Sequence, residues 1–252
     1  MRKFRAKKRE KHSLKGKQMK NTTLTYNTPA EVWTEALPLG NGRLGAMIYG
    51  GTTREEIRFN EETFWSGWHD EEADNPECRA HLDEMRALLF AGEYLVCRGD
   101  GSGSGKGFEH AYGSFETAGR LLIDFDDAEA TGYRRTLNLE KGEADVAYTA
   151  GGKFTREYFT CPEPDCFVGR INCSGTFSAA FTYERKFASV RYSDDMILMT
   201  GKFNKGLDYA VGVKLVTDGK LSGDGGKITL TDARECLLYV SAKTNYSEDI
   251  IP

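Results

Sequence analysis

Apolar and polar residues alternate in a strand-like rhythm along the second half of the chain. From Leu121 on, short apolar segments recur about every ten residues, with Gly, Asp or Asn between most of them. Within Phe154–Phe159, the residues Phe154, Arg156 and Tyr158 share one face, and the residues between them share the other. This pattern is typical of an antiparallel β-sandwich, whose expected strands are LLIDF, RRTLNL, ADVAYT, FTREYFT, CFVGRI, FSAAFTYE, MILMTG, YAVGVKLVT, KITL and CLLYVSA.

The first half of the chain predicts a β-hairpin. Leu44–Gly50 is a short apolar run between glycines, as in a buried strand. Ile57–Asn60 alternates with charged neighbours and is expected to pair with that run across a turn at residues 50–53. Just before the first strand, Leu39–Gly45 is expected to be a tight loop, because its glycines permit positive φ or close backbone approach.

A single helical pattern interrupts the β rhythm. Its signals are a capping residue, a proline at the first helical position, three apolar residues at helical spacing and a closing glycine, namely Asn75, Pro76, Leu82, Met85, Leu89 and Gly92. We therefore expect a mainly β fold, an antiparallel β-sandwich with one short helical insertion near residues 75–97.

Composition agrees with one large β domain or two small ones. The 252 residues are 39% hydrophobic and 12% aromatic, and 28 glycines against 6 prolines suit many tight turns. No run approaches the roughly 18 consecutive apolar residues of a membrane span, so no membrane partner is expected. No apolar segment follows Met1 or Met19, as a secretory signal would require, so a cytoplasmic location is expected.

The six cysteines are expected to be reduced thiols in that compartment. Cys161, Cys166 and Cys173 are spaced five and seven residues apart, unlike the CxxC pairs of structural zinc sites. A further group of metal-ligand types lies in an acidic stretch before the helix and consists of His69, Cys78 and His81; a solvated acidic turn is the favoured alternative. No metal and no cofactor is expected.

Charge is distributed unevenly. Residues 1–18 hold nine Lys or Arg and one acid, so this segment carries eight positive charges and the rest of the chain is strongly acidic. Such an arm can bind phosphates, but an acidic body opposes docking on nucleic acid. A disordered basic tail is the favoured interpretation, and no nucleic-acid partner is expected.

Few side chains offer catalytic chemistry. Glu35, Glu61 and Glu62 are the plausible local carboxylates for glycoside hydrolysis, which needs two acids flanking the scissile bond. A surface or structural role is the favoured alternative for them. The glycine-rich stretch 99–107 is a loop and no phosphate-binding P-loop, since Lys106 is followed by Gly instead of Ser or Thr.

Aromatic residues in the same segment offer a stacking surface for sugar rings. Trp65 and Trp68, with Trp33 and Tyr112, are the candidates, and packing in the sandwich core is the favoured alternative.

Three blocks of the front segment resemble the opening of glycoside hydrolase family 95, the α-L-fucosidase family. They are WTEALPLGNGRLGAMIYGG (Trp33–Gly51), IRFNEETFWSG (Ile57–Gly67) and EMRALLFAGEY (Glu84–Tyr94), and their order and spacing match as well. The resemblance continues more weakly to about residue 246. In one departure, Arg120 stands where the family usually has an Asp, so the contacts of that acid are not expected to be preserved.

The resemblance implies a β-sandwich N-terminal domain, a helical linker, an (α/α)6 barrel and a small C-terminal β domain. The general acid and the water-activating Asp of this inverting family lie in the barrel, so no catalytic residue is assigned here. We expect a basic disordered tail at residues 1–20, the β-sandwich N-terminal domain at 21–246 and the start of a truncated linker at 247–252, with the catalytic barrel absent.

The function expected from the resemblance is that of the N-terminal domain of an α-L-fucosidase-like glycoside hydrolase, inactive alone. Its expected partners are fucosylated or related glycans and a catalytic (α/α)6 barrel, in cis or in trans. Two alternatives stay open: a free-standing carbohydrate-binding sandwich, and an inactive remnant or split-gene product.

Four residues are the candidates for substrate binding or for the junction with a barrel: Asn41, Arg43, Asn60 and Trp65. Asn41 and Arg43 are placed on the tight loop before the hairpin, where their side chains can face a partner domain or the rim of a sugar site. The equally favoured alternative is local, with Asn41 closing the turn and Arg43 pairing with a nearby acid.

Overall fold

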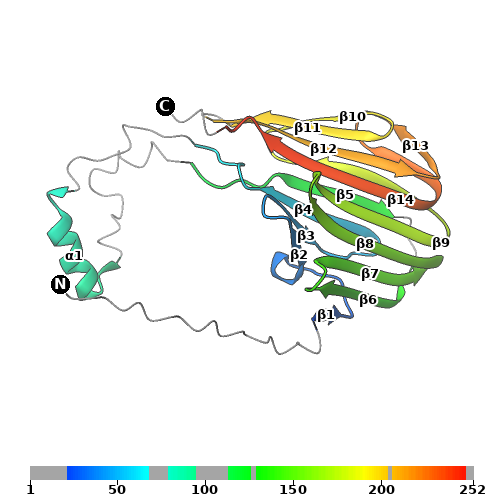
Figure 1. Ribbon diagram of the computed structural model, residues 1–252, viewed down its shortest axis with the longest axis horizontal. Helices are drawn as coiled ribbons and strands as arrows, with labels where there is room; N and C mark the ends of the chain where they lie inside the picture. Colours follow the sequence, from blue (N-terminus) through cyan, green and yellow to red (C-terminus); the bar gives the residue numbers. More distant parts are fainter. Residues whose placement is uncertain (1–21, 68–78, 95–112, 126–128, 204–205, 248–252) are drawn as a thin grey trace, which may run out of the picture.

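The computed structural model describes residues 22–67, 79–94, 113–125, 129–203 and 206–247 (Figure 1). Within these ranges the chain is mainly antiparallel β-sheet, with one α-helix. None of the described helical segments has the length and apolar character needed to cross a bilayer. The expected basic tail, the glycine-rich loop at 99–107 and nearly all of the expected linker lie outside the described residues.

The elements follow one another as a long series of strands. They are β1 (Thr23–Tyr26), η1 (Trp33–Glu35, a 3-10 helix), β2 (Leu37–Gly40), β3 (Leu44–Ile48), β4 (Arg54–Glu61), α1 (Leu82–Ala91), β5 (Gly119–Phe125), β6 (Thr131–Asn138), β7 (Glu143–Ala150), β8 (Gly152–Pro162), β9 (Asp165–Glu184), β10 (Ser189–Tyr192), β11 (Met196–Lys202), β12 (Asp208–Thr217), β13 (Lys220–Gly223) and β14 (Ile228–Thr244).

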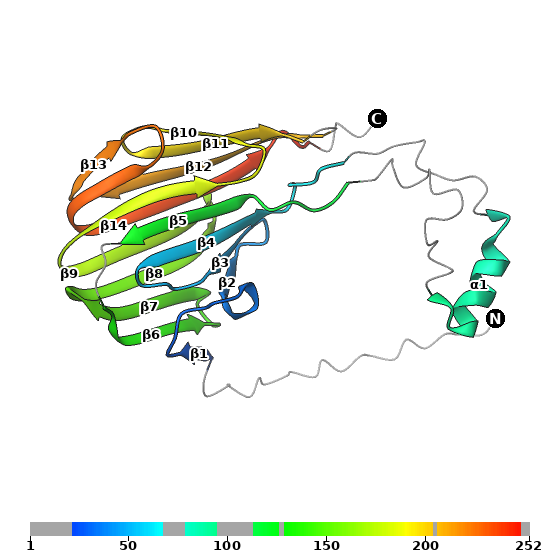
Figure 2. The ribbon, with the colours of Figure 1, turned by 180° about the vertical axis from the view of Figure 1, so that it is seen from behind.

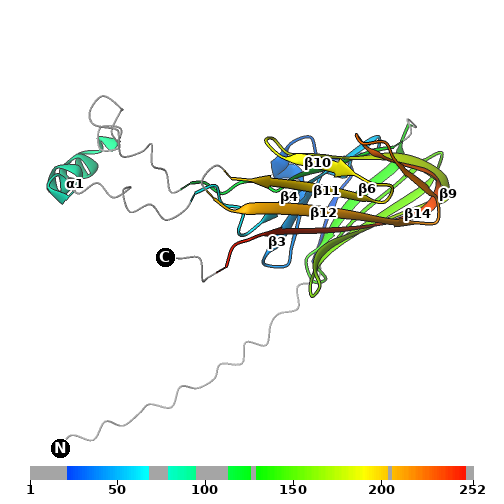
Figure 3. The same cartoon turned by 90° about the horizontal axis from the view of Figure 1, so that it is seen from above.

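The long strand β9 divides the sheet into two layers. One edge of β9 pairs with β14, while its other edge pairs first with β8 and then, beyond Cys173, with β5. From this branch point β8, β7, β6 and β1 continue one layer, and β5, β4, β3 and β2 form the other. The layers face each other, since β2 contacts both β7 and β8. Figures 2 and 3 show the sheet curling over itself.

The core fills the space between these layers. Ile57 and Phe59 of β4 are fully buried, as are Tyr158 of β8 and Phe167 of β9. The rings of Phe59 and Phe167 meet edge to face with 5.2 Å between centroids, a favourable aromatic geometry. The expected mainly β, sandwich-like fold is therefore confirmed, as is the hairpin, in which Ile48 of β3 pairs with Ile57 of β4.

A charged pair is buried in this core. The alternation of β8 places Arg156 on the inner face, and its side chain is 0% exposed. Arg156 Nη1 donates to Glu55 Oε2 of β4 at 2.8 Å, and Nη2 donates to the carbonyl of Gly51. Glu55 Oε1 accepts the Gly50 amide and Glu55 Oε2 accepts the Tyr158 hydroxyl. The pair links the two layers.

Burial acts on both partners of this pair. It is the main cause that raises the pKa of Glu55, against the opposing effect of Arg156. For Arg156, burial alone would lower the pKa, but Tyr158 and Glu55 outweigh it, so the net shift is upward and the guanidinium stays charged. The rings of Phe125 and Tyr148 lie 5.2 and 5.0 Å from the guanidinium carbon of Arg156 and provide further cation–π contacts.

The helix α1 stands apart from the sheet (Figure 1). It ends at Gly92, whose φ of 82° gives the left-handed cap that glycine favours. None of its residues is buried. The helix begins at Leu82, and the capping residues expected at 75 and 76 lie outside the described ranges.

Candidate functional site

One end of the sheet gathers the candidate site residues. We call it the Arg43 end and define it by residues 41–43, 60–67, 113–118, 185–188 and 244–247. The pairing register brings these segments together, because Leu44 pairs with Glu61, Phe59 with Gly119 and Arg120 with Glu184. Thr63 Oγ1 also lies 2.5 Å from Thr244 Oγ1, which joins the ends of β4 and β14.

Asn41 closes the turn between β2 and β3. Its Oδ1 accepts the amides of Arg43 at 3.0 Å and Leu44 at 2.8 Å. Its Nδ2 donates to the Cys161 carbonyl and to Asp165 Oδ1, both at 2.7 Å, across to the β8–β9 hairpin. Both ends of the amide are therefore engaged within the fold, which is the local role that the sequence left open.

Arg43 pairs with a buried acid on the neighbouring strand. Its Nε and Nη2 both lie 2.9 Å from Glu61 Oε1, and Asp165 Oδ2 is 3.4 Å from Nε. The hydrogen bond to Glu61 is the main cause that raises the pKa of Arg43. Glu61 Oε2 accepts the amide and the hydroxyl of Thr63. A fully buried carboxylate is thus satisfied on both oxygens, while Arg43 itself stays half-exposed.

Asn41→Ala is expected to lower the free energy of unfolding by about 2–3 kcal/mol, because four hydrogen bonds between three segments are lost. Asn60→Ala is the matched control and should change stability by less than about 0.5 kcal/mol, since Asn60 is exposed at the same end. Urea unfolding of both variants checks this. Equal effects of the two substitutions would show that Asn41 does not hold the loop to the β8–β9 hairpin.

Asn60 and Trp65 complete the candidate set and lie on the surface. A shallow hollow beside Arg43 is lined by Gly40, Gly42, Arg43, Leu44, Gly45, Asn60, Glu61, Glu62 and Phe115. Trp65 forms a β-bridge with Phe115, and the two residues are 42% and 48% exposed. The structure thus brings all four candidates to one end, none of them in the core, although whether they bind a ligand or a partner stays a prediction.

Trp33 does not share this surface. It lies on η1, next to the Leu37 end of β2, whereas Trp65 follows the Glu61 end of β4. Both indoles are exposed instead of packed in the core. Trp68 and Tyr112, the other members of the expected stacking surface, lie outside the described residues.

Sequence reasoning missed Asp165, Thr63 and Phe115. Asp165 lies 124 positions after Asn41 and meets it only through the β8–β9 hairpin. Phe115 belongs to the returning arm of the insertion, which pairs with the outgoing arm through Ser66 N and Ser114 O. Thr63 bonds Glu61 two positions away, but its contact with Thr244 is also remote in sequence. No local spacing signals the remote contacts, because they depend on how the strands meet.

The carboxylates at the Arg43 end do not form a hydrolytic pair. Glu61 is buried and both of its oxygens accept hydrogen bonds, while its sequence neighbour Glu62 is exposed. Glu35 lies on η1, near the other end of the sheet, where it accepts the Glu31 amide. Glu61 and Glu62 both line the hollow beside Arg43, but the Glu61 carboxylate is engaged on both oxygens. These three acids therefore do not offer the two available carboxylates that glycoside hydrolysis needs.

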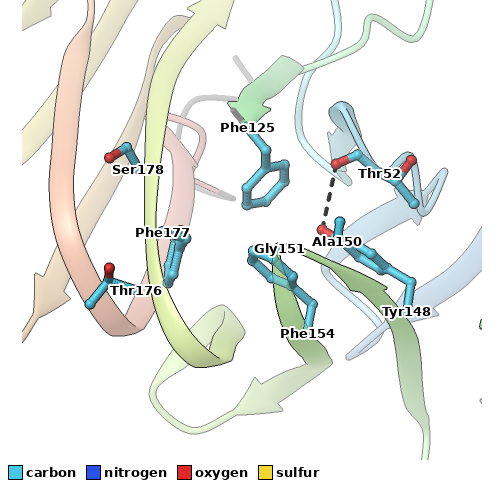
Figure 4. Close-up of a pocket in the computed structure, with 9 residues that line it drawn as sticks. All are labelled: Thr52, Phe125, Tyr148, Ala150, Gly151, Phe154, Thr176, Phe177 and Ser178. Carbon is cyan, nitrogen blue, oxygen red and sulfur yellow. Dashed lines mark hydrogen bonds between the residues drawn. The ribbon is translucent and has the colours of Figure 1, made fainter. Parts of the chain in front are cut away.

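A second hollow lies at the opposite end of the layers (Figure 4). Its lining is aromatic and hydroxylic, with Thr52, Phe125, Tyr148, Ala150, Gly151, Phe154, Thr176, Phe177 and Ser178. Tyr148 and Phe154 stack with 4.9 Å between centroids, and all four rings are less than a tenth exposed. It contains no carboxylate, so it offers no acid–base chemistry, and its rings pack against the buried Arg156.

Arg120, the departure from the family pattern, is well accommodated. Its guanidinium donates to Glu184 at 2.6 and 2.9 Å and to Glu56 at 3.3 Å on the outer face of β4, β5 and β9. The reversed charge is therefore balanced by two acids on adjacent strands. Because this pair is exposed, it adds little stability.

The described residues contain no candidate metal site. In those ranges, no group of three or more His, Cys, Asp or Glu is arranged to hold a metal ion. Of the ligand set considered from the sequence, His69 and Cys78 fall outside those ranges. His81 contacts Glu84 on α1 at 3.2 Å.

Comparisons with known proteins cover almost the whole described chain. Residues 24–249 match the family model described as "Glycosyl hydrolase family 65, N-terminal domain". Alpha-L-fucosidase 2 of Arabidopsis thaliana is 28% identical over 259 residues, which covers 88% of this chain and 30% of that protein. Probable alpha-fucosidase A of Aspergillus niger is 31% identical over 52% of this chain and 17% of its own length. The corresponding Aspergillus oryzae protein is 28% identical over 63% of this chain and 23% of its own length.

Proposed function

This chain belongs to the family of glycosyl hydrolase N-terminal domains matched over residues 24–249, and from that premise we propose that it is the N-terminal β domain of an α-L-fucosidase-type glycoside hydrolase. The chain spans about 30% of the length of the Arabidopsis relative. We propose further that the domain has no hydrolytic activity of its own and that its Arg43 end docks onto a catalytic (α/α)6 barrel.

The observation that carries the docking proposal is that, at the Arg43 end, key polar side chains bond within the domain while aromatic side chains are exposed. Its polar residues bond within the domain. Asn41 donates to Cys161 and Asp165 of the β8–β9 hairpin, and Arg43 donates to Glu61. Its outer surface carries four large exposed aromatic residues: Trp65, Phe115, Phe187 and Tyr246. Aromatic residues on a rigid polar scaffold are typical of the anchors of protein interfaces.

The position of the α1 insertion is further evidence that the Arg43 end is the docking face. Its two arms leave the sheet at the Arg43 end, where Ser66 and Ser114 pair. A helix of ten residues that buries no side chain is marginal in water by itself, because its stability in proteins comes chiefly from packing. Leu82 and Leu89 lie exposed on it and would pack on a docked barrel.

A chimera tests this proposal. If residues 22–247 replace the matched part of the Arabidopsis protein, we expect release of 4-nitrophenol from 4-nitrophenyl α-L-fucoside. The double substitution Trp65→Ala and Phe115→Ala should lower that release by at least tenfold, because truncated anchor residues cost an interface roughly 2 kcal/mol or more.

Trp33→Ala is the matched control for the chimera, because Trp33 is a similarly exposed indole away from the Arg43 end. It should leave hydrolysis unchanged. If Trp33→Ala impairs the chimera as much as the Trp65 and Phe115 pair, the Arg43 end is not the docking face.

A second function, glycan binding without cleavage, is favoured by one observation. Phe115 lines the hollow together with Asn60 and Arg43, and Trp65 forms a β-bridge with Phe115. Aromatic rings next to polar groups suit sugar recognition. A fucosylated oligosaccharide at 100 times its Kd should then stabilise the chain by about 2.7 kcal/mol and raise its Tm. Absence of a shift at millimolar ligand, or a shift that survives Trp65→Ala, would reject a glycan site at this hollow.

A further inference from the structure

Two cysteines face each other across the β8–β9 hairpin. The pairing register joins Pro162 with Asp165 and then Cys161 with Cys166, so two residues form the turn between the strands. Directly opposed residues of an antiparallel pair have Cα atoms about 4.5–5.5 Å apart and side chains on the same face of the sheet. Cys161 and Cys166 are therefore direct cross-strand neighbours on one face of the hairpin.

The geometry of this pair permits a disulfide. A Cα separation of about 4.5–5.5 Å lies within the range of disulfides, and Cβ atoms on one face of directly opposed residues are close enough to bridge with small adjustment. The Cys161 carbonyl also accepts the Asn41 side chain at 2.7 Å, which holds this strand of the hairpin against the Asn41 turn.

We propose that Cys161 and Cys166 are a dithiol site that a low-molecular-weight disulfide such as oxidised glutathione converts into a cross-strand disulfide. The Cys161 thiolate attacks one sulfur of the glutathione disulfide, and one glutathione leaves as a thiolate that takes up the proton lost by Cys161. The Cys166 thiolate then attacks Cys161 Sγ and displaces the second glutathione, which takes up the proton of Cys166. Two protein thiols are oxidised and one glutathione disulfide is reduced to two thiols.

The order of these steps follows from exposure. Cys161 is partly exposed, so it is the entry point for the oxidant, whereas Cys166 is buried behind it. Burial is the main cause that raises the pKa of Cys166, and the neighbouring Cys161 adds to it. This agrees with the register, in which the two thiols are direct neighbours.

The other described cysteines are not placed for this chemistry. Cys173 pairs with Phe154 in the register, and Cys236 pairs with Ile171 on one side and Thr217 on the other. Both are buried, and burial raises the pKa of Cys236 to about 12. They serve as internal controls for selectivity.

The Cys161–Cys166 disulfide would stabilise the Arg43 end, because the tip of the β8–β9 hairpin contacts the residues of that end. Asp165, next to Cys166, accepts the Asn41 amide and lies 3.4 Å from Arg43 Nε. A disulfide one pair below the turn would hold Asp165 in place and thereby fix the Asn41 loop. Amide hydrogen exchange of the 161–166 hairpin should accordingly slow in the oxidised chain.

The test is incubation of the folded chain with oxidised glutathione, followed by alkylation and peptide mapping. We expect a chain about 2 Da lighter, with Cys161 linked to Cys166 and with Cys173 and Cys236 alkylated as free thiols. Dithiothreitol should restore both thiols. Cys166→Ser should trap glutathione on Cys161, and Cys161→Ser should leave Cys166 free, which gives the order of attack.

Three results would overturn the proposal. They are a stable glutathione adduct on Cys161 in the unmodified chain, a cross-link that joins Cys161 or Cys166 to another cysteine, and retention of both free thiols after an incubation that oxidises a reference dithiol. The mapping is done on the unmodified chain, so it stands even if a serine variant does not fold.

Discussion

Glu55→Ala is expected to destabilise the fold by about 3–5 kcal/mol, the largest effect of any single substitution considered for this chain. The substitution leaves Arg156 charged and fully buried, with its main partner gone. It also strips the Gly50 amide and the Tyr158 hydroxyl of their acceptor. Removing one member of a buried ion pair costs far more than the pair contributes, because an uncompensated charge remains in the core.

Arg54→Ala is the matched control, since Arg54 is the adjacent residue of β4. It pairs with Asp124 across the strands, but both side chains are exposed, so its loss should cost no more than about 1 kcal/mol. Urea unfolding followed by circular dichroism measures both variants. If Glu55→Ala unfolds at the same urea concentration as Arg54→Ala, then water reaches Arg156 and the two layers are not joined through a dry ion pair.

Arg185→Ala is expected to cost about 2–4 kcal/mol. The Arg185 guanidinium lies 4.3 Å from the ring centroid of Tyr209, 5.3 Å from that of Phe203 and 5.9 Å from that of Phe64. It also donates to the Thr117 carbonyl and to the Tyr209 hydroxyl, so it joins the segment before β5 and the end of β9 to β12 at the Arg43 end. Cation–π contacts and charged hydrogen bonds of this kind contribute roughly 0.5–3 kcal/mol each and overlap in effect.

Arg191→Ala provides the comparison for Arg185, because Arg191 is an exposed arginine on the next strand, β10. It should change stability by less than about 0.5 kcal/mol. Arg185→Lys should recover only part of the loss, since an ammonium group lacks the planar fork that stacks on several rings and donates in fixed directions. Full recovery by lysine, measured by thermal unfolding, would mean that charge alone and not stacking holds this corner.

The alternation of apolar and polar residues predicted the fold class. It did not predict the boundaries of the long strands, because these depend on which strands pair in the folded sheet. The ten expected segments are all strands, but CFVGRI and FSAAFTYE are parts of β9, and KITL and CLLYVSA are parts of β14. The glycine and serine between the first two segments read as a break, whereas in the sheet they mark where β9 changes partner from β8 to β5. The short strands β2, β10 and β13 carry too few alternating residues to be recognised alone.

Only those parts of the candidate site that depend on neighbouring residues in the sequence were predictable. Glycines around Asn41 and Arg43 indicated the tight turn, and Gly42 does adopt a φ of 97°. The partners of that turn are remote in sequence: Glu61 follows 18 positions after Arg43, and Asp165 follows 124 positions after Asn41. Likewise, the alternation of β8 grouped Arg156 with Phe154 and Tyr158 on one face, but nothing near it in the sequence pointed to Glu55, 101 positions away, as its counter-ion.

The central claim, that this domain supports a catalytic partner and does not itself cleave glycosides, is tested most directly by assaying the pure 252-residue chain on 4-nitrophenyl α-L-fucoside. We predict no release of 4-nitrophenol above the buffer blank, since Glu61 is buried with both oxygens engaged and only Glu62 of this neighbouring pair is exposed. Release by the pure chain that disappears in Glu61→Gln or Glu62→Gln would contradict the claim and place the chemistry within this domain.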